Sequence, residues 1–313
     1  MSTTTSPGPV PAPGDASPGS TPIAATHRMP AGRWFVEIGW RHVVGLLAVA
    51  FAVFPILFVV SASVNPSGSL SATGLVPTDG VTVEHYAAML SGERANFLRW
   101  YLNTIIVCGV VAVVQVFLSL LAAYVFSRFR FRGRRGGMLA VLLVMMFPAI
   151  LSMIAVYTMI ADLGDAVPLL GLNTLAGYIA VLLGGSLGQV WLIKGFFDTI
   201  PKSLDEAATL DGATHWQTFS RILVPSMTPI LATTLLLALV GSMSEFLIGS
   251  IFLTDDSKKT LAVGMYGMFS SDRSNNLGVF AAGSVMVMVP VIVLYQFLQR
   301  YIVGGSTAGA VKG

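Results

Sequence analysis

The stretch Glu206-Ala207-Ala208-Thr209-Leu210-Asp211-Gly212 is a polar interruption between long apolar segments of a 313-residue chain. Hydrophobic residues make up 54% of the chain, charged residues only 11%, and the mean hydropathy is +0.77. These values are typical of proteins that cross a membrane several times, and soluble domains do not reach them. We therefore expect an all-α membrane protein in which this stretch forms a helix outside the bilayer.

Six apolar runs are long enough to cross the bilayer as helices, since a span needs about 20 apolar residues. Pro55, Pro148 and Pro290 fall inside three of them and predict kinks that neighbouring helices can accommodate. The runs lack the alternation of polar and apolar residues that a membrane β-barrel requires. The predicted spans of this helix bundle are approximately 43–63, 102–125, 138–161, 174–193, 227–253 and 278–301.

The N-terminal region differs from the rest in composition. Residues 1 to about 26 are rich in Pro, Ser, Thr and Gly and cannot bury a core, so residues 1–40 are predicted to be a disordered tail. The apolar run that follows could belong to a signal peptide, but its length and the long preceding tail favour an uncleaved first span. The predicted membrane domain is 41–303, followed by a short tail at 304–313.

The distribution of Lys and Arg predicts the orientation in the membrane. With the N-terminus in the cytoplasm, thirteen of the 18 Lys and Arg residues fall on the cytoplasmic side and five on the outer side. The positive-inside rule then places both termini and the Glu206 stretch in the cytoplasm. Five of these residues lie between Arg128 and Arg135, where an anchor at lipid headgroups is favoured over a dedicated partner site.

The cytoplasmic loop 194–225 is predicted to form two short helices. Ser203 and Glu206 have the spacing of a capping box, and Gly212 stands where the first helix would end in a left-handed conformation. Thr214 and Gln217 repeat the capping spacing for a second helix. From these residues alone, Glu206 could be no more than a capping carboxylate, and the loop could lie on the bilayer surface. A buried side is predicted for Leu204, Ala207, Ala208, Leu210, Trp216, Phe219, Ile222 and Leu223.

The spacing of this loop resembles the signature loop of ABC importer permeases, namely Glu206-Ala207-Ala208, three residues, Gly212, nine residues, Ile222 and Pro225. Val224 replaces the usual Leu. Other segments resemble carbohydrate-type permeases, most closely the G-type permease subunits of maltose and maltodextrin importers, over roughly residues 40 to 313. These segments are Asn103-Thr104, Phe131-Arg132-Gly133-Arg134, Met146-Phe147-Pro148, Lys194-Gly195-Phe196-Phe197-Asp198 and Gly309-Ala310-Val311-Lys312-Gly313.

The resemblance implies the type I ABC importer permease fold and contact with a separate ATPase. Ala207, Ala208 and Gly212 would then permit close approach to an ATPase subunit, while Glu206 and Asp211 would offer carboxylates to it. The same resemblance implies that the tail Gly309, Ala310, Val311, Lys312 and Gly313 is a second contact, although such a terminus would otherwise be taken as frayed.

The chain itself offers little for catalysis. It contains no ATP-binding loop of the form Gly, four residues, Gly-Lys-Ser/Thr, so energy has to come from another polypeptide or an ion gradient. Cys108 and the four histidines form no group with the spacing of a metal or catalytic site. We expect no catalytic residue, no metal and no cofactor on this chain, with ATP and Mg used by the partner ATPase. The basic residues form no nucleic-acid-binding stripe.

Three polar residues lie inside the predicted spans. Glu245 is the one acidic residue well within a span, where a carboxylate is costly and by default suggests function. A hydrogen bond between helices is favoured for it over a direct part in translocation. Gln115 and Gln189 could line a polar path for a sugar, although such amides more often join neighbouring helices.

The leading hypothesis is a multi-pass permease subunit in a bacterial plasma membrane, belonging to an ATP-driven sugar importer, with maltose or maltodextrin as cargo. Its expected partners are a second permease, a pair of ATPase subunits, an extracytoplasmic sugar-binding protein and the lipid bilayer, without nucleic acid. A secondary sugar transporter driven by an ion gradient is the alternative, and it would need coupling-ion sites near the midplane. A membrane-embedded enzyme is less favoured because no catalytic group converges in the spans.

Overall fold

The computed structural model describes residues 31–67, 74–77, 80–92, 96–271 and 277–307. Within these ranges all regular structure is helical and no strand occurs. The chain divides into two units, residues 1–54 and 55–313, which are considered separately. This all-helical architecture agrees with the predicted fold class.

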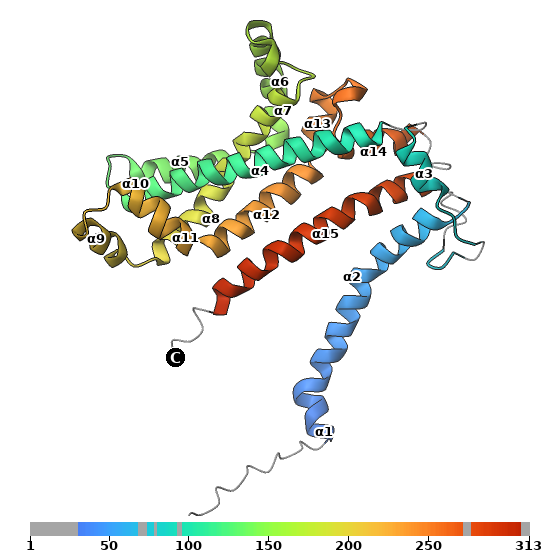
Figure 1. Ribbon diagram of the computed structural model, residues 1–313, viewed down its shortest axis with the longest axis horizontal. Helices are drawn as coiled ribbons and strands as arrows, with labels where there is room; N and C mark the ends of the chain where they lie inside the picture. The colour runs from blue at the N-terminus through green and yellow to red at the C-terminus, as the bar shows by residue number, and fades with distance from the viewer. Residues whose placement is uncertain (1–30, 68–73, 78–79, 93–95, 272–276, 308–313) are drawn as a thin grey trace, which may run out of the picture. The chain divides into compact units, whose positions relative to one another are not determined.

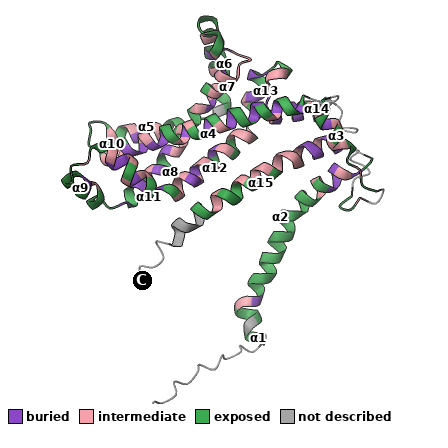
Figure 2. Cartoon of the chain, in the orientation of Figure 1, coloured by how far each residue is buried: buried purple, intermediate pink, exposed green. Residues whose placement is uncertain are grey.

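The first unit contains α1 (Ala31–Trp34), the π-helical turn η1 (Phe35–Gly39) and most of α2 (Trp40–Val64). The chain is thus helical from Ala31, so the last ten residues of the predicted tail, 31–40, are helical. Residues 1–30, where the rest of that tail was predicted, lie outside the described residues. Most of α2 is exposed (Figure 2). Its exposed residues include many large apolar side chains, with Phe51 85% exposed, as expected for a helix that faces lipid.

In the second unit, α4 (Phe97–Arg128) is the central helix. It packs along α8 (Ser186–Thr199) and α12 (Thr228–Ser244), and α12 in turn packs on α15 (Leu277–Thr307), as Figure 1 shows. With 32 residues, α4 extends about 48 Å and exceeds the predicted span 102–125 at both ends. It therefore links structures on the two sides of the membrane.

Two of the predicted spans are broken helices. The third consists of α5 (Arg134–Met146) and α6 (Ala149–Ala166), bent by more than 40° beside Pro148, where the sequence predicts a kink. Pro55 and Pro290, by contrast, lie inside the continuous helices α2 and α15. Just before the fifth, the helical stretch His215–Ser226 meets α12 at 78°, and this stretch lies outside the predicted span. The described residues hold four helices that could each cross a membrane, or six when each bent pair is one span, as predicted.

The fourth span is continuous in direction but changes helix type midway. It contains α7 (Leu175–Leu182), the 3-10 turn η3 (Leu183–Gly185) and α8. The fifth ends earlier than predicted, because α12 stops at Ser244 and a separate α13 (Leu247–Phe252) follows. Residues 245–253 therefore do not continue the span.

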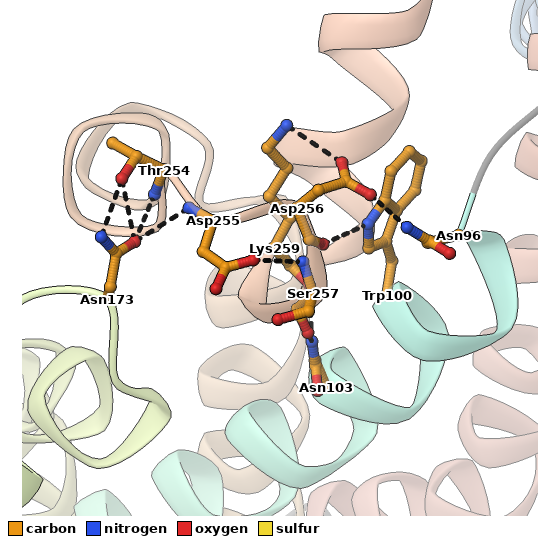
Figure 3. Close-up of polar contacts among 9 residues, drawn as sticks. All are labelled: Asn96, Trp100, Asn103, Asn173, Thr254, Asp255, Asp256, Ser257 and Lys259. Atoms are coloured by element: carbon orange, nitrogen blue, oxygen red, sulfur yellow. Dashed lines mark hydrogen bonds and ion pairs between the residues drawn. The ribbon is translucent and has the colours of Figure 1, made fainter.

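At one end of α4, a polar loop (254–259) that includes the 3-10 turn η5 (Asp256–Lys258) is tied to the bundle (Figure 3). Asn103 donates to the carbonyl oxygens of Ser257 and Lys259 at 3.0 and 2.9 Å. The Trp100 indole donates to the Asp256 carbonyl at 2.9 Å, and the Asn173 side-chain oxygen accepts from the Thr254 and Asp255 amides. Two short helices, α3 (Glu84–Leu90) and α14 (Leu261–Ser271), contact this end of α4.

Candidate functional site

At the other end of α4 lies the surface segment (203–226), which contains the Glu206 stretch. It consists of α9 (Ser203–Leu210), α10 (His215–Thr218), the π-helical turn η4 (Phe219–Leu223) and α11 (Val224–Ser226). Two short helices were predicted here. The first is α9, and the second consists of three consecutive helical elements, α10, η4 and α11, which end just before Met227.

The predicted capping box at the start of α9 is wrong. Lys202, with helical backbone angles, is the N-cap, and no side chain caps this end. The Glu206 amide donates instead to the Lys202 carbonyl at 3.0 Å. The helical turn already begins with the bond from the Leu204 amide to the Pro201 carbonyl, so Ser203 sits inside the helix, where its hydroxyl cannot cap the first turn. The Glu206 carboxylate is thereby left free of a capping role.

The end of α9 agrees with the sequence. Gly212 has φ of +78°, a left-handed conformation that disfavours any residue with a side-chain carbon. The Gly212 amide donates to the Thr209 carbonyl at 3.1 Å and the Ala213 amide to the Ala208 carbonyl at 2.9 Å. This pair of bonds is the Schellman motif, which satisfies the last carbonyls of a helix. Two residues later, the predicted capping box of Thr214 and Gln217 is present.

The surface segment is held to the bundle from inside. Arg128, the last residue of α4, forms an ion pair with Asp205 of α9 at 3.0 Å, and the two side chains are only 8% and 23% exposed. The same guanidinium donates to the Phe197 and Ile200 carbonyls at 3.3 and 3.1 Å. Because the guanidinium has a fixed fork of donors, it joins three chain segments at one point. Arg128 is therefore not the headgroup anchor that its place in the Arg cluster predicts.

An apolar cluster completes this attachment. Its buried members come from α4, α8 and the stretch α10 to α11, and they pack around Tyr124, whose ring centroid is 4.8 Å from that of Phe219. The cluster includes Leu120, Ala123, Tyr124, Ile193, Phe197, Ile200, Phe219, Leu223 and Met227. The predicted buried side of the second helix is confirmed for Phe219 and Leu223.

Burial divides the predicted ATPase-contact residues. Glu206, Ala207, Asp211 and Gly212 are exposed on the surface segment, whereas Ala208 is buried. Ala208 thus faces its own bundle and cannot offer close approach to another protein. The predicted buried side is also wrong for three large residues, since Leu204 is 42%, Leu210 88% and Trp216 61% exposed.

Glu206 borders a hollow of about 510 Å³ between α9 and the end of α4. Basic groups line the hollow with it, namely Arg128, Arg130 and Lys202. The carboxylates of Glu206 and Asp205 and these cations make the hollow polar, while Leu210 adds an apolar edge. Such a mixed, partly charged recess is suited to a segment of another protein. The other predicted contact, residues Gly309 to Gly313, lies outside the described residues.

The three polar residues predicted inside the spans come together. They line one cavity of about 270 Å³, here called the membrane cavity. Its wall includes Gln115 of α4, Gln189 of α8 and Glu245, together with Gly185 and Ser242. Gln115 donates to the Leu182 carbonyl at 2.6 Å, where the switch from α7 to η3 frees a carbonyl. A Cβ on Gly185 would lie 2.8 Å from the Gln115 amide nitrogen, so a side chain at this position would push the end of Gln115 aside.

Hydrogen bonding in the cavity is incomplete. Gln189 donates only a long bond of 3.4 Å to the Gln115 side-chain oxygen. The Gln189 side-chain oxygen is buried and accepts no hydrogen bond from the residues described. A buried acceptor without a donor is costly, so it suits a donor brought by a bound molecule or by water.

Glu245 occupies the break between α12 and α13. Its backbone is extended, with φ of −71° and ψ of 115°, and its carboxylate accepts from the Ile248 and Gly249 amides at 2.7 and 3.0 Å. The hydroxyl of Tyr178 on α7 donates to it at 2.5 Å. Glu245 thus forms a hydrogen bond to another helix, as favoured from the sequence. Its carboxylate also accepts from the free amides at the start of α13, which stabilises a new helix where the predicted span would have continued.

Comparison with known proteins gives the family. Residues 115–305 match the family model of the binding-protein-dependent transport system inner membrane component. The chain belongs to this family. The matched region contains the surface segment and all three cavity residues. Both candidate sites therefore lie in the part of the chain that matches the family model.

Among its relatives is the maltose/maltodextrin transport system permease protein MalG of Vibrio vulnificus strain YJ016, 38% identical over 286 residues, which cover 88% of this chain and 96% of the relative. The protein of the same name from Escherichia coli strain K12 is also 38% identical, over 87% of this chain and 95% of its own length. A solved bacterial ABC transporter involved in the import of the acidic polysaccharide alginate has a similar chain, with a TM-score of 0.71, 25% identity and coverage of 88% and 99%.

Three residues that form contacts at the candidate sites were not predicted from the sequence. Arg128 was hidden in a basic cluster, Asp205 next to the more conspicuous Glu206, and Tyr178 among apolar residues of a span. Each acts through a partner far away in the chain. A Tyr inside an apolar run was the one available indication, because its hydroxyl requires a hydrogen-bond partner when buried.

Proposed function

We propose that the chain is one permease subunit of an ATP-driven, binding-protein-dependent sugar importer, with maltose or maltodextrin as cargo. Its partners in the bacterial plasma membrane are a second permease, two ATPase subunits and an extracytoplasmic sugar-binding protein. Family membership and two relatives named as maltose/maltodextrin permeases support this assignment over a secondary transporter. The ATPase subunits would bind and use ATP and Mg, and this chain would carry no cofactor.

The observation that carries the proposal is the two-sided construction of the surface segment. Its inner side is fixed to α4 by the Arg128 to Asp205 ion pair and to α4 and α8 by the apolar cluster around Tyr124. Its outer side presents Leu210 and Trp216, large apolar groups that a lone membrane protein gains nothing by exposing to water. Such residues are typical anchors of protein interfaces.

We infer that Glu206, Ala207, Asp211 and Gly212 contact the ATPase, with Leu210 as an apolar anchor. Ala208 supports the helix from within instead. The tail 309–313 is proposed as a second ATPase contact on the resemblance alone. Since Arg128 and Gln115 belong to one helix, movement of the surface segment would be transmitted along α4 toward the membrane cavity.

The membrane cavity is proposed to border the sugar path. Neutral amides suit a neutral sugar, because each can both donate to and accept from a hydroxyl. The free acceptor on Gln189 is the clearest candidate contact, and Glu245 would keep the path in shape through Tyr178 and α13. Gln189→Leu is expected to lower sugar uptake about fivefold, the equivalent of one hydrogen bond. Gln296→Leu, a change of an exposed amide on α15, should leave uptake unchanged; equal effects would reject the path.

The docking assignment is tested by co-purification of the whole assembly. Glu206→Gln and Gly212→Ala are expected to reduce the amount of ATPase that stays bound and to reduce uptake in proteoliposomes. Two matched controls lie elsewhere in the chain: Glu84→Gln removes another exposed carboxylate, and Gly80→Ala strains another exposed glycine, with φ of +101°. Retention of ATPase and uptake in the Glu206 and Gly212 variants would show the assignment to be wrong.

Cargo is tested separately, with the intact assembly and its binding protein in proteoliposomes. Maltose, maltotriose and trehalose compete for uptake of a labelled maltodextrin. We expect maltose and maltotriose to compete and trehalose to compete weakly. Failure of all three would reject the proposed cargo while leaving the docking assignment intact.

A further inference from the structure

A second recess lies between α5 and α8, away from the surface segment. It has a volume of about 530 Å³ and is lined by Arg134, Arg135, Met138, Leu139, Trp191 and Lys194. Three of these residues are cations and three are apolar. This division distinguishes it from the membrane cavity, which holds no cation in its lining.

Positive charge in the recess is only partly compensated. Lys194 pairs with Asp198 at 2.6 Å, and Arg134 donates a long bond of 3.4 Å to the Ser127 carbonyl. Asp198 is the acidic group at this place, and Ser127 also donates to it at 2.7 Å. Arg135 is exposed and forms no ion pair with the residues described. One carboxylate therefore faces three cations, which leaves an excess of two positive charges.

The backbone adds to this excess. Arg134 and Arg135 begin α5, whose first turn contains no acidic residue. The start of a helix carries partial positive charge, so cations there are unfavourable unless an anion is close. The sequence thus puts positive charge where the helix already has it, beside a recess large enough to admit a small anionic group.

The apolar half of the recess points to the bilayer. Leu139 is 60% exposed and Trp191 is 39% exposed, and both lie on helices assigned to spans three and four. The basic ends of these helices mark the predicted cytoplasmic edge of the membrane. A tryptophan at such an edge contacts acyl chains with its ring while it faces the headgroup region.

We propose that this recess binds one anionic phospholipid, with its phosphate between Arg134, Arg135 and Lys194 and an acyl chain along Leu139 and Trp191. A free phosphate would use the cations but not the apolar wall. A zwitterionic lipid would use the apolar wall but would bring its own positive charge to the cations. Basic recesses between membrane helices on the cytoplasmic side are suited to anionic headgroups in this way.

The test uses the complete transporter in nanodiscs that contain phosphatidylcholine and a rising share of phosphatidylglycerol. In one series the phosphatidylglycerol carries bromine on its acyl chains near the headgroup, and in the other the phosphatidylcholine does. Bromine quenches tryptophan fluorescence at short range, and the signal of Trp191 is the difference between the wild-type assembly and Trp191→Phe. We expect the Trp191 signal to be quenched at a lower share of brominated phosphatidylglycerol than of brominated phosphatidylcholine.

Variants then assign the site. Arg134→Gln and Arg135→Gln should each raise the share of phosphatidylglycerol required about fivefold. Arg132→Gln is the matched control, since it removes an exposed charge from the same loop but does not line the recess, and it should change the requirement less than twofold. Sodium phosphate at the concentration of the lipid should leave the quenching unchanged.

Several results would overturn the proposal. Equal quenching by the two lipids would mean no preference for an anionic headgroup, and equal effects of Arg132→Gln and Arg135→Gln would mean general surface charge. Relief of quenching by sodium phosphate would identify a soluble anion as the ligand. Absence of quenching by either lipid would mean that another subunit covers the recess.

Discussion

The two ends of α4 carry loops of opposite character. The polar loop (254–259) meets its hydrogen-bonding needs within the chain, through Asn103, Trp100 and Asn173 (Figure 3). The surface segment (203–226) is fixed on its inner side only and leaves Leu210 and Trp216 exposed. A loop that satisfies itself is built for stability, whereas one that is firmly held yet displays apolar groups is built to be contacted by another protein.

The largest effect is expected at the point that holds the surface segment. Arg128→Met would leave the Asp205 carboxylate without its cation and would remove one donor from each of the Phe197 and Ile200 carbonyls. Breaking a mostly buried ion pair is expected to destabilise the assembly by about 3 kcal/mol. The melting temperature of the purified assembly in detergent measures this. Arg132→Met, which changes an exposed residue of the same cluster, should have almost no effect; similar losses from both would show that the ion pair is not what fixes α9.

A smaller loss is expected at the opposite end of α4. Asn103→Leu removes the donor to two carbonyls of the polar loop and should cost about 2 kcal/mol of stability. Because the polar loop is self-contained, binding of the ATPase should not change below the melting temperature. Co-purification at low temperature measures this, and loss of ATPase binding in this variant would erase the distinction between the two ends.

The smallest effect is expected at Asp255, which is exposed in the polar loop. The Ser257 amide donates to its carboxylate at 2.9 Å, and this bond lowers the pKa of the Asp255 carboxyl below its ordinary value. The bond therefore stabilises the loop above the ordinary Asp pKa of about 4 and loses its effect as the pH falls through the lowered pKa. Asp255→Asn should melt slightly lower than the wild type at pH 7 and identically in strong acid. A gap that persists in acid would assign the effect to something other than this charge.

Local chemistry made part of this structure predictable from sequence. Hydropathy located six spans, and the left-handed Gly212 and the Thr214 capping box followed from rules that involve neighbouring residues only. The failures share a different cause. Arg128 pairs with Asp205, which is distant in the chain, instead of serving as the predicted headgroup anchor. The break at Glu245 likewise depends on Tyr178, 67 residues away, and no local pattern reports such a partner.

The central claim is that the exposed side of the surface segment receives an ATPase subunit, and Leu210 tests it most directly. Leu210→Asp and the control Leu169→Asp both change strongly exposed leucines, at 88% and 70%, in different parts of the chain. The affinity of purified ATPase subunits for the membrane-reconstituted permease pair is measured for each. We expect Leu210→Asp to weaken binding about tenfold, without a change in melting temperature, and Leu169→Asp to bind like the wild type. Unchanged ATPase binding by the Leu210 variant would contradict the account.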